Sequence, residues 1–219
     1  QQVDLLGCDE TPVKLIVPPQ LPELDPRDPR TARIVEVLSA AQAKGRPSVQ
    51  ARMWAYRSLD LPFNFFDFTV SRHRDGPDEV LSDFKGFLMG DCWSGFQKIE
   101  LRSNARIQRG ACWAHARRKL DECRTSHPRH TTVLLSLIRQ LYDLEDRPKL
   151  WAAERRGELR QGESLRVLKQ IREYIGGPPL ERLLLKNDLA KAVGYLKNNW
   201  DAFVQPFSSS SAENAGNSV

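Results

Sequence analysis

The sequence predicts an α/β protein, in which helices pack on a mixed β-sheet. Strand-like runs dominate the first 70 residues, and strand-like and helical segments then alternate up to about residue 124. After His127-Pro128 the pattern is helical throughout. Consecutive strands followed by strand–helix alternation are typical of a mixed sheet flanked by helices. The last part of the chain adds a helical portion to this core.

The amino-terminal half contains most of the expected strands. Residues 3–17 are expected to hold an apolar strand, with Asp9 and Glu10 in it or just past it, and a second extended piece at 13–17. Five prolines within residues 18–30 favour a stiff, non-helical connection, and a helix follows at 31–44 until Gly45 and Pro47 stop it. The remaining elements are expected in this order: strands at 52–59 and 63–70, a short helix at 76–85, a strand at 86–91, a further helix, a strand at 105–111 and a basic helix at 112–124.

The carboxy-terminal part is predicted to be helical. Apolar residues at helical spacing mark 131–145, a charged helix covers 151–175, and a third helix at 186–200 has Asn187 or Asp188 as its cap. The Ser-rich end is small and polar, which is typical of disorder. The expected organisation is a core at 1–127 with an insert at about 18–47, a helical region at 128–204 and a disordered tail at 205–219.

The composition argues against a membrane protein. Of the 219 residues, 40% are hydrophobic and 28% are charged, which is enough for a packed core. No apolar run approaches the roughly 18 residues that span a bilayer, and the start lacks the basic region of a secretory leader. Four cysteines without such a leader favour reduced thiols in a cytoplasm. Because the chain does not begin with Met, we expect a piece of a longer product.

The positive charge is concentrated in one block. Residues 101–130 hold eight Lys or Arg against Asp121 and Glu122, so their excess of +6 exceeds the +5 of the whole chain. A single basic block on an otherwise balanced protein indicates binding to a polyanion such as nucleic acid. An ordinary solvated helix face explains the same charge equally well. In either case Arg117, Arg118 and Lys119 cannot all face one way on a helix.

Two aspartates end apolar strand-like runs 82 residues apart, namely Asp9 and Asp91. Acids at the open ends of neighbouring strands can converge beyond the sheet edge, where mutual repulsion favours a cation between them. Mg²⁺ suits such a site, since it takes few carboxylates and keeps places for water and phosphate oxygens. The alternative is that both acids merely cap turns. Glu10 faces the opposite side of the strand, so we expect it to be structural.

A zinc site is the alternative interpretation of the basic helix. Cys112-x2-His115 and Cys123-x3-His127 supply thiol and imidazole ligands at short spacings. However, Cys112 and Cys123 lie about three turns apart if one helix holds both. Buried thiols and a locally bonded histidine therefore explain the pattern better than a metal.

Five phrases of the sequence carry a family resemblance. They occur in the family's order and cover most of residues 3–204: CDETPVKLI, FKGFLMGDCWSGFQKI, GACWAHARRKLDEC, LLSLIRQLYDLE and LAKAVGYLKNNW. Together they resemble the bacterial insertion-sequence transposases of family sixty-six. The resemblance implies a ribonuclease-H-like fold and a catalytic Asp-Asp-Glu triad that binds two Mg²⁺ ions, with Mn²⁺ as a substitute. Asp9 matches the first aspartate of that triad and Asp91 the second.

The resemblance also implies partners and contacts. Cys112, His115, Arg117 and Arg118 match a signature that lies between the second aspartate and the glutamate. The expected partner is double-stranded DNA at transposon ends and target sites, in a bacterial cytoplasm at the nucleoid, and a homo-oligomer is compatible with this role. The residues expected to contact DNA are Arg109, His115, Arg117, Arg118 and Lys119.

The chain also departs from the family pattern. The glutamate-bearing element should fall at or just beyond residue 219, and Glu213 lacks its flanking residues, so the third acid is not assigned. The insert at 18–47 is longer than the family's usual connection. One hypothesis is therefore an incomplete catalytic core for DNA strand cleavage and transfer, weakly active at most. The alternative is a non-catalytic DNA-binding remnant or regulator.

Overall fold

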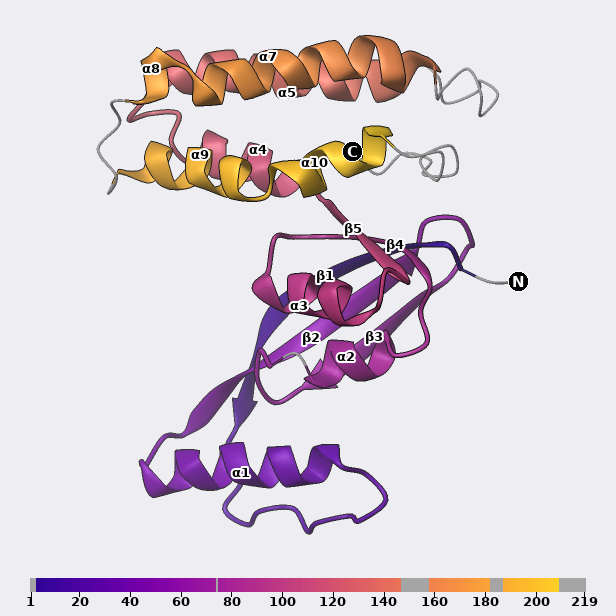
Figure 1. Ribbon diagram of the computed structural model, residues 1–219. Helices are drawn as coiled ribbons and strands as arrows, with labels where there is room; N and C mark the ends of the chain where they lie inside the picture. Colours follow the sequence, from indigo (N-terminus) through magenta and orange to yellow (C-terminus); the bar gives the residue numbers. More distant parts are fainter. Residues whose placement is uncertain (1–2, 74, 147–157, 182–186, 209–219) are drawn as a thin grey trace. The chain divides into compact units, whose positions relative to one another are not determined.

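The computed structural model describes residues 3–73, 75–146, 158–181 and 187–208 (Figure 1). Its five strands form one mixed sheet in the order β3-β2-β1-β4-β5. β1 and β5 each pair in parallel with β4, whereas β2 and β3 are antiparallel. This arrangement confirms the predicted α/β, ribonuclease-H-like fold class. The strands are β1 Leu5–Ile16, β2 Ser48–Ser58, β3 Asn64–Thr69, β4 Gly86–Gly90 and β5 Ile107–Ala111.

The helices follow the expected order. In the first 125 residues they are α1 Arg30–Ala43, α2 Asp75–Val80, α3 Ser94–Arg102 and α4 Trp113–Asp121. After them come α5 Pro128–Asp146, the π-helical turn η1 Arg160–Ser164, α7 Leu165–Gly176, α8 Pro178–Glu181, α9 Asp188–Asn198 and α10 Trp200–Ser208. Within the described residues, no helix is long and apolar enough to cross a membrane.

The chain divides into two compact units, which are described separately. The hairpin unit comprises Cys8–Arg57 and Phe63–Phe84, and the helical unit comprises Gln1–Gly7, Ser58–Pro62 and Lys85–Val219. The predicted domain ranges divide the chain differently, at residue 127, and they stay a prediction. The core of the helical unit crosses that boundary, because α4 shares it with α5 and the later helices.

The hairpin unit is built on the β2–β3 hairpin. Trp54 and Tyr56 are fully buried on one face of β2, where the Trp54 indole N–H donates to Thr69 Oγ1 (2.8 Å) and Tyr56 stacks on Phe65 (4.7 Å between centroids). Arg30 at the start of α1 ties that helix to β3 and α2 through ion pairs with Asp67 (2.6 Å) and Glu79 (2.7 Å). These contacts therefore join α1 to the hairpin and to α2.

Two expectations for the first half are corrected in detail. The two extended pieces predicted within residues 3–17 are one continuous strand, β1, in which Pro12 is exposed. An exposed position tolerates proline because the lost N–H is not needed in a buried ladder. α2 ends at Val80 rather than Lys85, and residues 81–83 continue as a turn and bends.

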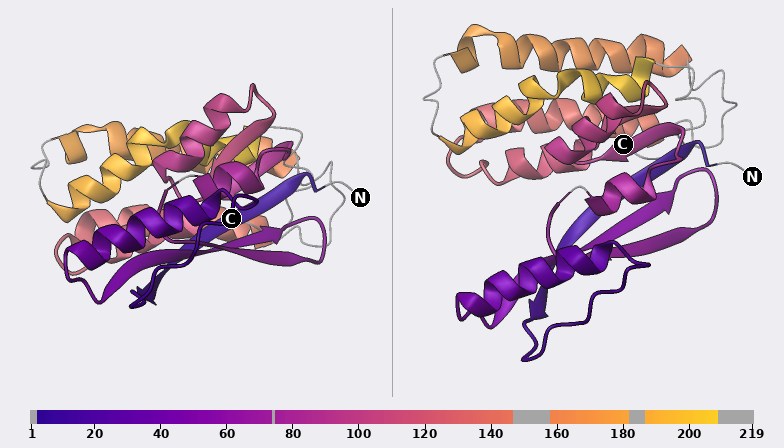
Figure 2. Two further views of the ribbon diagram at one scale, coloured as in Figure 1. Left: turned by 90° about the horizontal axis from the view of Figure 1, so that it is seen from below. Right: turned by 60° about the horizontal axis from the view of Figure 1, so that its bottom comes forward.

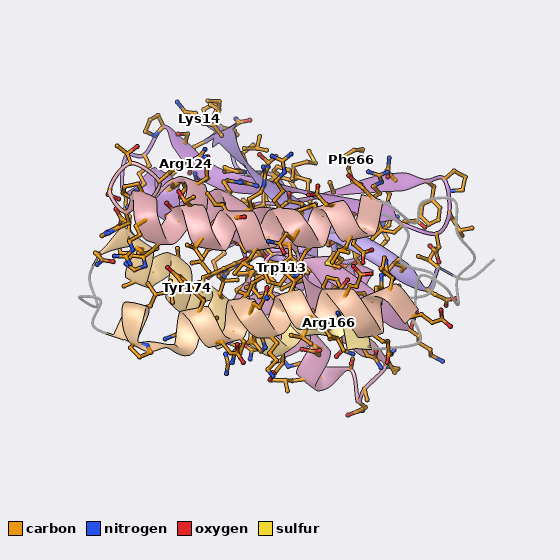
Figure 3. The ribbon with its side chains drawn as sticks, turned by 90° about the horizontal axis from the view of Figure 1, so that it is seen from above. Lys14, Phe66, Trp113, Arg124, Arg166 and Tyr174 are labelled. Carbon is orange, nitrogen blue, oxygen red and sulfur yellow. The ribbon has the colours of Figure 1, made fainter. Side chains whose placement is uncertain are left out.

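The helical unit has one large core. Figures 1 and 2 show α5 running beside α7, with α9 beside α4. Trp113 of α4 lies in this core, between α5 and α7 in the view of Figure 3, and its indole N–H donates to the carbonyl of Phe203 in α10 (3.2 Å). The motif tryptophan is therefore a core residue, which is what aromatics beside apolar segments usually are.

The end of the chain differs from the expected boundary. The helix predicted at 186–200 is α9, which stops at Asn198, and a further helix that was not predicted, α10, begins at Trp200. α10 continues to Ser208, so residues 205–208 are helical and not tail, because Phe203 and Phe207 are buried one turn apart. The cap was predicted correctly, since Asn187 Oδ1 accepts the Ala190 N–H (2.6 Å). Residues 151–157 of the charged helix and 209–219 of the tail lie outside the described residues.

Candidate functional site

Asp91 follows directly after β4, a strand held on both sides. The register pairs Leu5 with Phe87 and Gly7 with Met89 on one side, and Gly90 with Ala111 on the other. Residue 86 must be glycine here, because its φ is +144° and a Cβ would overlap the carbonyl of Asp4. The half-buried Asp91 then turns the chain toward α3, where its Oδ1 accepts the Trp93 N–H (3.0 Å). A carboxylate is thus fixed at the carboxyl end of a central strand.

Asp9 lies in the middle of β1 with an exposed side chain. Its Oδ1 accepts the N–H of Glu10 (2.9 Å). Glu10 points to the other face and forms ion pairs with Arg52 and Arg72, both 2.8 Å, while its side chain is only 12% exposed. The expectation that Glu10 is structural is confirmed by these two arginines. Its carboxylate is already neutralised by cations and is a poor candidate for a metal ligand.

Asp9 and Asp91 belong to different compact units. Within the helical unit, the parallel pairing of β1 with β4 runs up to Gly7 and Met89. Asp9 lies two residues after Gly7, and Asp91 lies two residues after Met89. Their meeting around a shared ion stays a prediction.

Cys112 connects β5 to the basic helix. Its N–H donates to the carbonyl of Gly90, the residue before Asp91 (2.8 Å), and it is the N-cap residue of α4. Burial alone would raise the pKa of the Cys112 thiol. Hydrogen bonds from the His115 side chain and from the N–H groups of Ala114 and His115 outweigh burial and lower the pKa below its usual value. His115 therefore favours the thiolate form of Cys112 at the start of α4.

The three consecutive cations of α4 are all exposed, but they point in different directions. Arg117 lines a groove between α4 and α5, whereas the Lys119 ammonium lies over the ring of Tyr195 in α9, 4.9 Å from its centroid. The expectation that they cannot share one face is confirmed. The basic helix therefore presents charge along a band rather than at a point.

Arg109 does not belong to that exposed band. Its residue is 8% exposed on β5, its N–H donates to Glu100 Oε1 (2.9 Å), and its guanidinium forms an ion pair with Glu100 (3.4 Å). A buried, paired arginine ties β5 to α3 and is poorly placed for a DNA backbone. Arg109 as a surface DNA contact is therefore corrected: the sequence placed it in the basic block and on a strand, but could not show that its side chain is buried and paired with Glu100.

The zinc interpretation gains no support. Cys112 precedes α4, while Cys123 follows it, buried, with its thiol donating to the carbonyl of Lys119 (3.2 Å). Among the described parts of the chain, no group of three or more His, Cys, Asp or Glu side chains is placed to hold a metal ion. The thiols are thus explained by packing and local hydrogen bonds.

The sequence analysis did not single out two residues that contact the segments around Asp91 and Arg109. Tyr195 of α9 accepts the Cys92 N–H through its hydroxyl (3.2 Å), and burial raises the pKa of Tyr195 far above its usual range. Glu100 holds Arg109, as described above. Tyr195 occupies a partly buried position of an amphipathic helix, so the sequence alone suggests a packing residue. Its hydrogen bond to Cys92, a residue far away in the sequence, can be seen only in the structure.

Comparison with known proteins adds the family. A family described as "Transposase IS66 family" matches residues 35–219, which include Asp91 and the basic helix but not Asp9. No solved structure matches the chain. Three curated relatives come from Sinorhizobium fredii, and each is named only as an uncharacterized protein.

These relatives are similar over much of this chain and a minor part of their own. Protein y4hP is 25% identical over 176 residues, covering 69% of this chain and 31% of the relative. Protein y4qI is 28% identical over 161 residues, covering 68% and 30%, and y4jD is 29% identical over 192 residues, covering 83% and 34%. The chain thus spans about a third of the length of these relatives. By the match over most of its length, the chain belongs to the Transposase IS66 family.

Proposed function

We propose that this chain is the catalytic core region of a DNA transposase, which cuts and joins DNA strands in a metal-dependent reaction. The observation that carries the proposal is the parallel register of β1 and β4 up to Gly7 and Met89. Continued for two residues, this pairing would make Asp9 and Asp91 neighbours on one face, because side chains alternate along a strand and neighbouring strands lie about 4.8 Å apart. Two such carboxylates repel unless a cation lies between them.

The donor chemistry fits Mg²⁺, with Mn²⁺ as a substitute. Both proposed ligands are carboxylates, the oxygen donors that Mg²⁺ prefers. Glu10, the nearest further acid in sequence, is held by two arginines. A third acid therefore has to come from elsewhere, and it is not assigned. Two ions, as the family resemblance implies, would need that ligand as well.

The roles of the protein's own groups follow from this placement. When bound, Mg²⁺ would activate a water or a DNA 3′-hydroxyl and neutralise charge on the phosphate that is attacked. Asp9 and Asp91 would fix the position of that charge, and the hydrogen bond from the Trp93 N–H would orient the Asp91 carboxylate. His115, Arg117, Arg118 and Lys119 would hold the backbone of double-stranded DNA, at transposon ends and at the target, in a bacterial cytoplasm.

Nicking of supercoiled plasmid DNA by the purified chain in Mg²⁺ or Mn²⁺ tests this function. We expect slow nicking that needs the metal and is abolished by Asp9→Ala and by Asp91→Ala. Asp83→Ala is the matched control, since Asp83 is an exposed acid outside the site and its loss should leave nicking intact. Metal-dependent nicking that survives both Asp9→Ala and Asp91→Ala would refute the assignment.

A second function is favoured by the exposed cations of α4. A non-catalytic DNA-binding protein or regulator derived from a transposase would need only this band. It would bind DNA with a steep dependence on salt, show no nicking, and bind equally well after Asp9→Ala and Asp91→Ala. The same set of variants therefore separates the two functions.

A further inference from the structure

A groove lies between α4 and α5 in the helical unit. Its volume is about 600 Å³, and its lining residues are Ala114, Arg117, Asp121, Arg124, Leu135, Arg139, Tyr142 and Asp143. α4 and the turn that follows it supply one wall, and α5 supplies the other. Three guanidinium groups face two carboxylates there, so the lining carries a net positive charge.

The cations of this groove are available to a ligand. No ion pair joins Arg117 to another described residue, and its side chain is exposed. The side chain of Arg124 is 67% exposed, and its pair with Asp121 is long, at 3.5 Å. The side chain of Arg139 is 82% exposed, and its pair with Asp143 is longer still, at 3.9 Å. Charge-assisted hydrogen bonds are usually about 2.7–2.9 Å long, and exposed pairs contribute about 0–1 kcal/mol. A phosphate could therefore replace either carboxylate at small cost.

The spacing of these cations suits a DNA strand. Arg117 lies in α4 and Arg124 lies in the turn that follows this helix, seven residues further along the chain, so their guanidinium groups can contact different phosphates. Arg139 faces them from α5, and Figure 3 shows Arg124 at the edge of the bundle beside that helix. Cations on both walls can therefore contact several phosphates of one strand.

The helix that forms one wall of the groove begins close to Asp91. α4 begins next to Cys112, whose N–H bonds the carbonyl of Gly90, and Asp91 is the next residue after Gly90. All of these residues belong to the helical unit. A strand that leaves Asp91 along α4 therefore enters the groove.

We propose that the groove between α4 and α5 seats the phosphate backbone of one DNA strand, with Arg117, Arg124 and Arg139 as its contacts. The proposal rests on the proposed function and names the path that the DNA takes from that site. Asp121 and Asp143 pair with Arg124 and Arg139 in the absence of DNA, and their negative charge opposes the binding of phosphates.

The test is the salt dependence of binding to a fluorescently labelled duplex, measured by anisotropy. Each phosphate contact contributes about 0.9 to the slope of log affinity against log salt. We expect Arg117→Gln, Arg124→Gln and Arg139→Gln each to lower the slope by about 0.9 and the triple variant by about 2.7. Arg166→Gln is the matched control, since Arg166 is an exposed arginine on α7 outside this groove (Figure 3). Asp121→Asn and Asp143→Asn should tighten binding.

The outcomes separate this proposal from the proposed function. If the wild-type protein binds DNA and the triple variant keeps the wild-type slope, the groove is overturned and the transposase function stands. If the wild-type protein binds no DNA, the proposed function fails first and the groove with it. Circular dichroism of each variant confirms that a changed slope does not reflect unfolding.

Discussion

The indole of Trp93 occupies the space that a side chain at residue 95 would need. A Cβ built on Gly95 would overlap three carbons of that ring. The ring also packs edge-on against Phe96, with centroids 5.1 Å apart. The glycine leaves room for the indole over the first turn of α3. The backbone N–H of the same tryptophan donates to Asp91 Oδ1, so the residue that needs Gly95 also orients the carboxylate. The packing of this ring therefore explains why residue 95 is a glycine.

Gly95→Ala should lower the free energy of unfolding by about 1–3 kcal/mol, the usual cost of inserting atoms into a packed region. Gly194→Ala is the matched control, because nothing lies within 4 Å of a Cβ at this helical position. Alanine there should be neutral or stabilising. Denaturant unfolding of both variants checks this, and equal stability of the two would contradict the packing argument.

Glu10→Gln should destabilise the hairpin unit by about 2 kcal/mol, since it leaves Arg52 and Arg72 without their shared carboxylate. The control is Glu36→Gln, which removes an exposed pair with Arg33 and should change stability by less than about 1 kcal/mol. Urea unfolding gives both values. A Glu10→Gln protein of unchanged stability that binds metal more weakly would instead make Glu10 a metal ligand.

Glu145→Gln should cost about 3–5 kcal/mol, because it breaks a buried ion pair. The Glu145 and Arg160 side chains are 7% and 6% exposed, and their closest N–O distance is 2.6 Å. The pair joins α5 to the π-helical turn that precedes α7. The control is Glu173→Gln, which removes an exposed pair with Lys169 and should have almost no effect on stability. Thermal unfolding of both variants measures the two effects. Similar melting temperatures for the two variants would show that the buried pair contributes little.

Cys112 should be the cysteine that iodoacetamide modifies first at neutral pH. The thiolate is the reactive form, and contacts with His115 and nearby N–H groups lower the pKa of Cys112, whereas burial raises the pKa of Cys92 and of Cys123. The pH at which half the maximal rate is reached should therefore be lower for Cys112. His115→Ala should raise that pH, as peptide mass spectrometry can follow. Modification of Cys123 before Cys112 would contradict this order.

Local patterns in the sequence predicted much of the fold. The strands, the basic helix, the Asn187 cap and the structural role of Glu10 all depend on periodicity, capping chemistry or the alternation of side chains. These signals act over a few residues, and the structure confirms them. The ends of elements were less certain: α10 continues through Pro206 because Phe203 and Phe207 fill the core, and a Ser-rich composition concealed that packing.

Pairings between distant residues could not be predicted. Arg109 was assigned to the DNA surface because its charge is visible in the sequence, whereas its partner Glu100 and its burial are set by the packing of β5 on α3. Likewise, Tyr195 reaches Cys92 from more than a hundred residues away. Composition locates charge along the chain, and only the fold decides which charges face outward.

The most direct test of the central claim is a titration of Mn²⁺, followed by electron paramagnetic resonance, into the wild-type protein, Asp9→Asn, Asp91→Asn and the double variant. If both aspartates bind one ion, each single substitution should weaken that site at least about tenfold, and the double substitution should cost less than the sum of the two. Wild-type Mn²⁺ affinity in both single variants, or effects that simply add, would contradict the claim that Asp9 and Asp91 share a metal ion.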